Sequence, residues 1–258
     1  MADELNREVL VCATPEAVAR EAARRFVLHA AAAIQQRGRF AVALSGGSTP
    51  KRLYELLAQD PYRDQVDWDY VHFFWGDERF VPFTNPASNY HMTEVALLNA
   101  LELTNGNIHR VQTELESADA AAAAYEQEIV KFFGLAKGEL PKFDLILLGI
   151  GTNGHTASLF PYSNALRVRD RLVAAEYIDE VKQARITLTV PVLNAAREAT
   201  FLVTGAEKAN VVKEVLMGPA DPDRLPAQLV HPNPGSVTWL IDKAAAAELP
   251  ASSVRLLT

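Results

Sequence analysis

Cysteine is almost missing from this sequence, because Cys12 is the single cysteine among 258 residues. One cysteine excludes an internal disulfide framework and a zinc site built from cysteines. Since Cys12 lies in the apolar segment 9–13, we expect a buried structural thiol rather than a nucleophile. The chemistry of the chain must therefore reside in other side chains.

Long hydrophobic runs are also missing. The longest apolar stretches, such as residues 71–75 and 145–150, are short, whereas a membrane-spanning helix needs about 20 apolar residues. The N-terminal sequence MADELNREVL is acidic and lacks the basic-then-apolar order of a secretory signal. We expect a cytoplasmic protein without a membrane segment.

Positive charge is scarce. The formal net charge is −7, and no cluster of Lys and Arg is longer than a pair. Nucleic-acid binding would need a basic face, so we expect no nucleic-acid partner. An anionic small molecule remains a possible substrate if local cations and helix N-termini outweigh the overall negative charge.

The composition itself is ordinary for a globular protein, with 49% hydrophobic and 22% charged residues. The length lies near the upper size for one hydrophobic core, and no repeat, linker or change of composition divides the chain. We therefore expect a single domain over residues 1–258. Its oligomeric state stays open between a monomer and a small homo-oligomer.

Strand and helix patterns alternate along the chain. We expect strands at residues 8–13, 39–44, 71–75, 108–111, 143–150, 171–177, 184–190 and 236–241. We expect helices at residues 15–38, 50–58, 88–100 and 117–133, a strand, turn and helix within 199–216, and a short alanine helix capped by Asp242. Thr204 and Glu207 have the spacing of a capping box. Apolar strands separated by helices predict an α/β three-layer sandwich with a mostly parallel sheet.

Three unusual loops fall at the ends of the expected strands, where ligands of parallel sheets bind. The first is Ser45, Gly46, Gly47, Ser48 and Thr49. Glycines, hydroxyl groups and a following helix N-terminus are typical of a phosphate cradle. The alternative is a tight turn with a Ser or Thr cap. The loop lacks the Gly-Lys-Ser/Thr ending of a nucleotide P-loop.

The second loop carries Asp77, Glu78 and Arg79. A solvated charge cluster is one interpretation. In the alternative, functional interpretation, Arg79 binds a substrate phosphate and Asp77 lies near the sugar. Shortly after this loop, Asn89 and Tyr90 could line a polar pocket or merely pack.

The third loop, in LILLGIGTNGHTASLFP, has three glycines and His155 behind a buried strand. We expect the glycines to bring the backbone close to a ligand on which His155 acts, because the imidazole pKa suits proton transfer near neutrality. No second histidine stands at metal-ligand spacing, and Ser158 lacks the setting of an activated serine. For the other histidines, we expect ordinary structural positions: His29, His72, His91, His109 and His231.

Two later cations stand out. Arg185 opens the alternating strand RITLTV, and Lys208 lies near the start of the helix within 199–216. A lysine there is commonly a solvated surface residue. It could also share a phosphate with the free N–H groups of the helix N-terminus.

Taken together, these segments resemble the 6-phosphogluconolactonases. The resemblance runs from Val9 to Ala246 and rests on motifs in the family's order: LSGGSTP, WGDERFVP, SNY, GIGTNGHTASLFP, RITLTVPVLNAAR, VTGAEKA and WLIDKAA. It implies a Rossmann-like fold shared with glucosamine-6-phosphate deaminases and ribose-5-phosphate isomerases. It also implies hydrolysis of 6-phospho-D-glucono-1,5-lactone in the oxidative pentose phosphate pathway, without a metal or organic cofactor.

The resemblance assigns roles to particular residues. It makes residues 45–49 the phosphate loop and His155 the general base, adds Asp77 and Arg79 from the Asp-Glu-Arg motif, and includes Arg185 and Lys208 as phosphate ligands. Asn153 and Gly154, next to His155, belong to the expected substrate site. The family usually has Asp-Gly-His where this chain has Asn153-Gly154-His155. Asn153 can hydrogen-bond but brings no charge, so we expect a less basic His155.

Two rival functions remain. The deaminase branch of the fold has His-Ile-Ala-Phe-Asn-Glu-Pro in the related loop, with a carboxylate five residues after the histidine; here that position is Phe160. A non-catalytic sugar-phosphate sensor would need an appended DNA-binding segment. We expect none, because the first strand is expected near Glu8 and the chain is acidic.

Overall fold

The computed structural model describes residues 6–257 except Glu102 and Thr104. The domain expected over residues 1–258 therefore includes some residues, at both ends and at positions 102 and 104, that lie outside the described part. No helix in the described part is both long enough and apolar enough to cross a bilayer.

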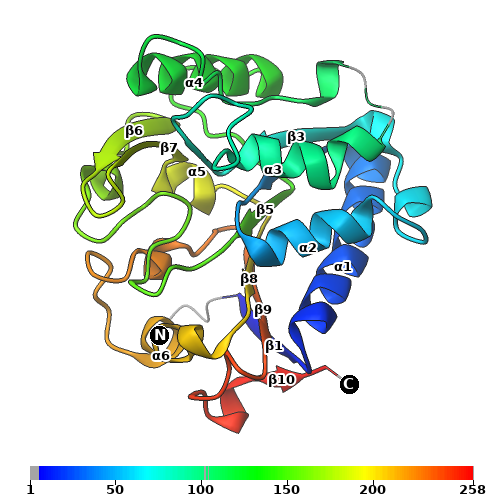
Figure 1. The fold of residues 1–258 in the computed structure, drawn as a ribbon, viewed down its shortest axis with the longest axis vertical. Helices are drawn as coiled ribbons and strands as arrows, with labels where there is room; N and C mark the ends of the chain where they lie inside the picture. Colours follow the sequence, from blue (N-terminus) through cyan, green and yellow to red (C-terminus); the bar gives the residue numbers. More distant parts are fainter. Residues whose placement is uncertain (1–5, 102, 104, 258) are drawn as a thin grey trace.

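A seven-stranded parallel sheet runs through the centre of the molecule (Figure 1). Its strands are β1 (Arg7–Cys12), β2 (Phe40–Leu44), β3 (Val71–Trp75), β5 (Leu145–Leu148), β8 (Glu198–Val203), β9 (Ser236–Asp242) and β10 (Arg255–Leu256). Their order is β10-β1-β9-β8-β5-β2-β3, and each neighbouring pair is parallel. The expected mostly parallel sheet is confirmed.

Helices cover both faces of this sheet (Figure 1). One face carries α1 (Pro15–Arg37), α2 (Ser48–Leu57) and α3 (Asn89–Ala96), and the other carries α4 (Ala118–Phe133), α5 (Val190–Asn194) and α6 (Ala209–Met217). Strand side chains alternate between the two cores: Val9 and Val11 join the core with α4 and α6, while Leu10 and the buried Cys12 join the core with α1. The three-layer sandwich is confirmed.

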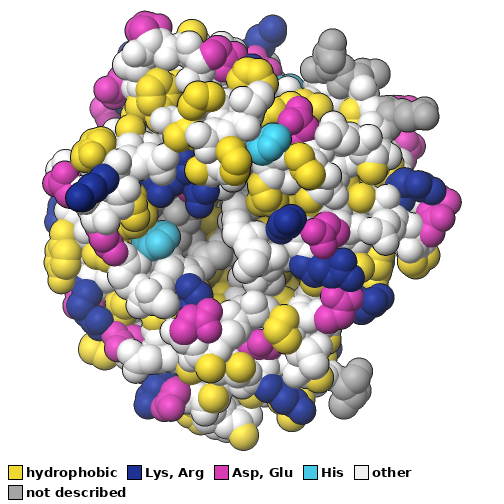
Figure 2. Space-filling model, viewed as in Figure 1, with side chains coloured by type: hydrophobic (Ala, Val, Ile, Leu, Met, Phe, Trp, Pro, Cys, Tyr) yellow, Lys and Arg dark blue, Asp and Glu magenta, His cyan; other side chains and the backbone are white. Residues whose placement is uncertain are grey.

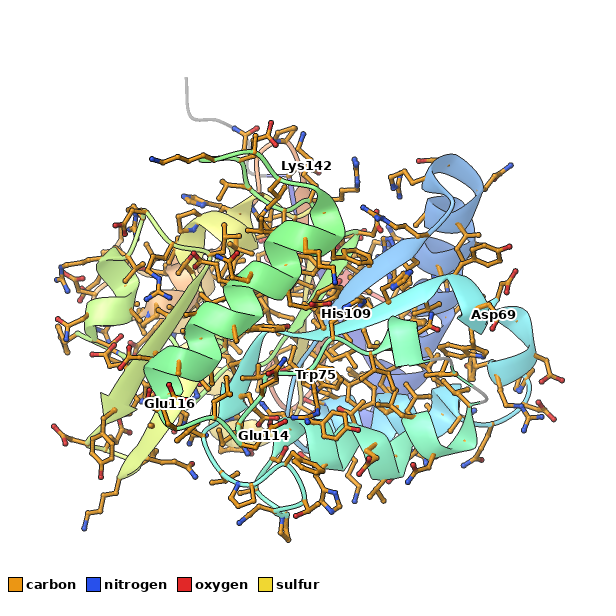
Figure 3. All side chains as sticks on the ribbon, turned by 90° about the horizontal axis from the view of Figure 1, so that it is seen from above. Asp69, Trp75, His109, Glu114, Glu116 and Lys142 are labelled. Carbon is orange, nitrogen blue, oxygen red and sulfur yellow. The ribbon has the colours of Figure 1, made fainter. Side chains whose placement is uncertain are left out.

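A second sheet, called the small sheet below, is antiparallel and separate from the first. It consists of β4 (Asp77–Arg79), β7 (Gln183–Leu188) and β6 (Val173–Ile178), and α4 packs against it. Figure 3 shows α4 running alongside β6 and β7. The strands expected at 171–177 and 184–190 thus pair with each other rather than joining the parallel sheet, and β4 forms within a segment expected to be a loop.

Three expected elements differ in the structure. Residues 108–111 form no strand: Ile108 makes an isolated bridge to Phe73, and the Arg110 side chain pairs with Glu114 at 2.6 Å and covers the Phe83 ring. The helix expected to reach residue 100 ends at Ala96, followed by a 3-10 turn that buries Leu98. The alanine segment after Asp242 forms turns rather than a helix, although Asp242 Oδ1 does accept the Ala245 N–H.

The strand order creates a crevice at a defined place. The chain passes from β2 outward to β3 and later returns on the other side of β2 as β5. Open α/β sheets bind ligands at such a reversal, beyond the carboxyl ends of the two strands. The loops after β2 and β5 both lie at this point, so the fold itself brings the first and third candidate loops together.

Candidate active site

A pocket of about 350 Å³ opens at the carboxyl ends of β2, β5 and β8. Figure 2 shows the same face of the molecule hollowed near its centre, with Lys or Arg and His side chains beside the hollow. The pocket is lined by residues 45–50, Asp77, Arg79, Asn89, residues 149–151, 155, 157, 158 and 160, Arg185, and residues 202–204, 207 and 208. The pocket therefore gathers residues from both sheets.

The loop after β2 leads directly into α2, which begins at Ser48 rather than at residue 50. Gly47, the residue before the helix, has φ +104°, which favours glycine, and no side chain caps the helix. The alternative of a Ser or Thr cap is therefore wrong. The first N–H groups of α2 are not used by a side-chain cap, so this positive helix end is available to an anion in the pocket.

Two hydroxyl contacts hold this loop in place. The buried Tyr54 hydroxyl accepts the Ser45 N–H at 3.0 Å and donates to the Ser45 carbonyl at 2.8 Å. Thr49 Oγ1 lies 2.8 Å from Thr204 Oγ1 at the end of β8. The capping box expected for Thr204 and Glu207 does not form; Gly205 at φ +104° precedes a 3-10 turn, and both residues line the pocket instead.

Two arginines face each other across the small sheet. Arg79 of β4 is the register partner of Arg185 of β7, and like charges directly opposite each other destabilise a sheet. Arg79 Nη1 donates to the Ala87 carbonyl at 2.6 Å, but its Nε is buried without a partner. Nε and Nη1 of Arg185 are also buried without partners. Burial and the neighbouring Arg79 lower the pKa of Arg185. An anion in the pocket would relieve both conditions.

Asp77 lies on the pocket side of β4 and is 8% exposed. Its Oδ2 accepts the Ser158 hydroxyl at 2.7 Å, and Asn89 Nδ2 donates to its carbonyl at 2.9 Å. A Cβ at Gly46 would approach Asn89 Oδ1 to 2.0 Å. Glycine at 46 thus allows the loop after β2 to touch the residue that anchors Asp77.

Glu78 points away from the pocket and is 2% exposed, so the interpretation of these charges as a solvated cluster is wrong. Its carboxylate accepts the N–H groups of Arg79 (2.7 Å), Asn89 (2.7 Å) and Tyr90 (2.8 Å) and the Ser88 hydroxyl (3.0 Å). Burial raises the pKa of Glu78. This side chain joins β4 to the start of α3.

His155 lies at the pocket wall after β5. Its Nδ1 is 2.6 Å from Asn153 Oδ1, and its ring stacks on Phe160 with centroids 4.3 Å apart. A Cβ at Gly151 would lie 2.1 Å from Nδ1, so only glycine leaves room for this imidazole. Burial lowers the pKa of His155 and outweighs the opposing effect of Asp77. The neutral ring that a general base requires is therefore favoured.

The residues beside His155 have different positions. Asn153 and Gly154, expected in the substrate site, are not part of the pocket wall; Asn153 lies behind His155. Gly149 and Gly151 do line the pocket. The Gly151 N–H donates to the His155 carbonyl at 2.8 Å and the Gly154 N–H to the Gly151 carbonyl at 2.9 Å, so neither is free for a ligand.

The expected site and the pocket wall largely coincide. Residues 45–49, Asp77, Arg79, His155, Arg185 and Lys208 all line the pocket. Sequence reasoning left Asn89 open, treated Ser158 as merely structural, and missed Thr204, Glu207 and the stacking role of Phe160. For Thr204 and Glu207 a signal was present, because they follow a strand at its carboxyl end.

The five other histidines lie outside the pocket wall. His109 stacks on Phe74 of β3 with centroids 4.3 Å apart and contacts Glu128 of α4 at 2.7 Å, which places it between these elements (Figure 3). Among the residues that the structure describes, no group of three or more His, Cys, Asp or Glu side chains is arranged to hold a metal ion.

Comparison with known proteins agrees with this geometry. The family model described as glucosamine-6-phosphate isomerases/6-phosphogluconolactonase matches residues 13–239. The chain belongs to this family. A 6-phosphogluconolactonase from Synechocystis sp. is 44% identical over 217 residues, which cover 84% of this chain and 88% of that protein. The structure of 6-phosphogluconolactonase from Trypanosoma cruzi has a TM-score of 0.84 at 30% identity, covering 96% of this chain and 99% of that one.

The fold extends beyond the lactonases. A monomeric glucosamine-6-phosphate deaminase has a TM-score of 0.77 over 93% of this chain and 99% of its own, at 21% identity. That likeness shows the fold alone. It confirms the expected relation between this family's sandwich and the deaminase fold.

Glu78 provides a test of how the site is held together. Glu78→Ala leaves four donors without their acceptor, and we expect it to lower the free energy of unfolding by more than about 2 kcal/mol, since one hydrogen bond to a charged group contributes about 1.5–3 kcal/mol. Urea unfolding of the purified variants measures this. The exposed Glu116→Ala is the control and should stay within about 0.5 kcal/mol of the wild type. Equal stability of Glu78→Ala and Glu116→Ala would contradict the assignment.

Proposed function

We propose that this chain hydrolyses 6-phospho-D-glucono-1,5-lactone to 6-phospho-D-gluconate, a step of the oxidative pentose phosphate pathway. The observation that carries the proposal is a pair of facing guanidinium groups with unpartnered buried donors in the same pocket as a histidine favoured in its neutral form. The guanidinium groups can bind an anion, and the neutral histidine can accept a proton. The names of the relatives supply the particular substrate.

In the proposed complex, the phosphate lies between the cations and the N-terminus of α2. Arg79 and Arg185 would donate to it from the small sheet, and residues 45–49 from the loop after β2. Lys208, at the end of the 3-10 turn after β8, completes this ring of donors. Asp77 would contact the sugar hydroxyls. In a chain of net charge −7, such local cations attract an anionic substrate.

His155 would act as the general base. Nε2 takes a proton from water as the water oxygen attacks the lactone carbonyl, and the imidazolium then returns a proton to the ring oxygen as the ester bond breaks. A lactone needs no covalent nucleophile for this reaction. The phosphate supplies remote binding energy that holds the carbonyl against the histidine.

Phe160 favours this reaction over the deaminase reaction. Ring opening in that branch uses a carboxylate five residues after the histidine, and Phe160 occupies that position with its ring stacked on His155. An apolar ring can neither donate nor accept a proton. A non-catalytic sensor would not need an oriented histidine, whereas His155 Nδ1 is held 2.6 Å from Asn153 Oδ1.

The wider setting of the enzyme is also proposed. Residues 1–258 would act as one catalytic domain, because both sheets contribute to one pocket. The single buried Cys12 needs no oxidising compartment, which supports a cytoplasmic location. We propose a monomer or small homo-oligomer without a nucleic-acid partner, in keeping with the net charge of −7.

The purified protein is expected to accelerate lactone hydrolysis without a metal ion. The measurement is a coupled assay in which 6-phosphogluconate is oxidised by its dehydrogenase, with the spontaneous hydrolysis of the lactone subtracted. Activity should persist after prolonged treatment with a chelator followed by its removal. Loss of activity that zinc or magnesium restores would contradict the metal-free mechanism, and no rate above the spontaneous one would refute the function.

His155→Ala is expected to lower kcat by about 10²–10⁴-fold, the usual contribution of a general base, while KM changes much less because the phosphate contacts remain. In the wild type, kcat/KM should decrease at low pH as His155 becomes protonated. The midpoint of this acidic limb of the pH profile should lie below the ordinary histidine pKa of about 6.5, since burial lowers the pKa of His155. The exposed His231→Ala serves as the control. Near-wild-type turnover in His155→Ala would make the histidine structural.

A further inference from the structure

Asn153 stands between His155 and Glu180, a residue of the turn that joins β6 to β7. Asn153 Oδ1 lies 2.6 Å from His155 Nδ1 and accepts the His155 backbone N–H at 3.2 Å. Asn153 Nδ2 lies 3.1 Å from each carboxylate oxygen of Glu180. One side-chain amide thus connects the imidazole to a carboxylate.

These contacts determine where the protons are. A carboxylate only accepts hydrogen bonds, so the NH₂ group of Asn153 must face Glu180. Asn153 Oδ1 then faces the imidazole, and since a carbonyl oxygen also only accepts, His155 Nδ1 must carry the proton. Nε2 is left with its lone pair, which is the form that a base requires.

We propose that Glu180 is a positioning residue for His155, because its carboxylate holds the Asn153 amide in the orientation that leaves Nε2 unprotonated. The proposal rests on the proposed role of His155 as the base. Without Glu180, the His155 backbone N–H at 3.2 Å still favours this orientation, but a fraction of the amides can turn over and donate from Nδ2 to Nδ1. The proton then moves to Nε2, and this tautomer cannot take a proton from water.

Charge is a separate and smaller contribution. The charged groups that act on His155 are Asp77 of β4, Glu180, Arg185 of β7 and Lys208 of the 3-10 turn; the first two raise its pKa and the last two lower it. Glu180 is exposed, so water and salt screen its charge. The orientation of an amide is not screened in this way, and we expect it to dominate the effect of Glu180 on turnover.

Two substitutions at position 180 separate orientation from charge. Glu180→Ala removes both, and we expect kcat to fall about 10-fold, the low end of the range for groups that orient a metal-bound histidine, with KM within about twofold. Glu180→Gln keeps an oxygen that can accept from Asn153, so kcat should stay within about twofold of the wild type while the acidic limb of kcat/KM moves slightly to lower pH. Asp179→Ala, an exposed acid of the same turn, is the matched control and should match the wild type.

The tautomer of His155 is a readout that does not depend on activity. Nitrogen-15 NMR of the imidazole, at a pH above its pKa, distinguishes a proton on Nδ1 from a proton on Nε2. The wild type, Glu180→Gln and Asp179→Ala should hold it on Nδ1, whereas Glu180→Ala should show a mixture. A wild-type tautomer and wild-type kcat in Glu180→Ala would overturn the proposal.

The decisive comparison uses Asn153→Asp as a background. Both oxygens of an aspartate accept, so it has no wrong orientation, and Glu180→Ala should no longer lower kcat there. The acidic limb of Asn153→Asp should itself move to higher pH, since a nearby negative charge raises the pKa of the imidazole.

If Glu180 merely supported the turn, Glu180→Ala would lower kcat equally in both backgrounds, and the proposal would be wrong. His155→Ala, assayed in parallel, keeps the two claims apart. If kcat falls sharply in His155→Ala while Glu180→Ala keeps full activity, only the proposed role of Glu180 is refuted. Full turnover by His155→Ala would refute the base itself.

Discussion

The pairing of β4 with β7 is the contact on which the site depends. Three residues of β4 alternate sides, so Asp77 and Arg79 face the pocket while Glu78 enters the interior and binds the start of α3. The same pairing sets Arg79 opposite Arg185. A shift of register by one residue would send Glu78 into the pocket and both of its neighbours out of it. The buried hydrogen bonds of Glu78 fix that register.

The parallel sheet provides the other half of the site. Its strand order reverses between β2 and β5, so the glycine loops after these strands meet beside the small sheet. The first loop presents a helix N-terminus, and the second presents His155. Arg79 and Arg185 come from the small sheet, whereas the loop after β2 and the proposed base His155 follow strands of the parallel sheet. The buried Tyr54 hydroxyl holds the loop after β2, and the partly buried Asn153 amide holds the histidine. The proposed phosphate contacts and the proposed base are thus positioned separately.

Much of this arrangement was predictable from the sequence. Apolar strand runs predicted the parallel sheet, and glycines at strand ends predicted where Ser45 and His155 would meet. Long-range pairing was not predictable: nothing local in Asp77-Glu78-Arg79 shows that it pairs with the strand at 183–188 or that Glu78 is buried. The capping-box spacing of Thr204 and Glu207 was overridden by Gly205 and the contact with Thr49. Asparagine at position 153 led us to expect no negative charge beside His155. The contact between Asn153 and Glu180 was not predictable, because Glu180 is distant in the chain.

The central claim is that the facing guanidinium groups of Arg79 and Arg185 bind the phosphate. Calorimetric titration with 6-phosphogluconate, the stable product, tests it most directly, with gluconate as the ligand that lacks the phosphate and Arg63→Ala as the control for an exposed arginine outside the pocket. Losing a charge-assisted hydrogen bond of about 1.5–3 kcal/mol should raise the Kd of Arg185→Ala by about 10- to 100-fold, and gluconate should bind the wild type weakly. Equal Kd values for 6-phosphogluconate in wild type and Arg185→Ala would contradict the account.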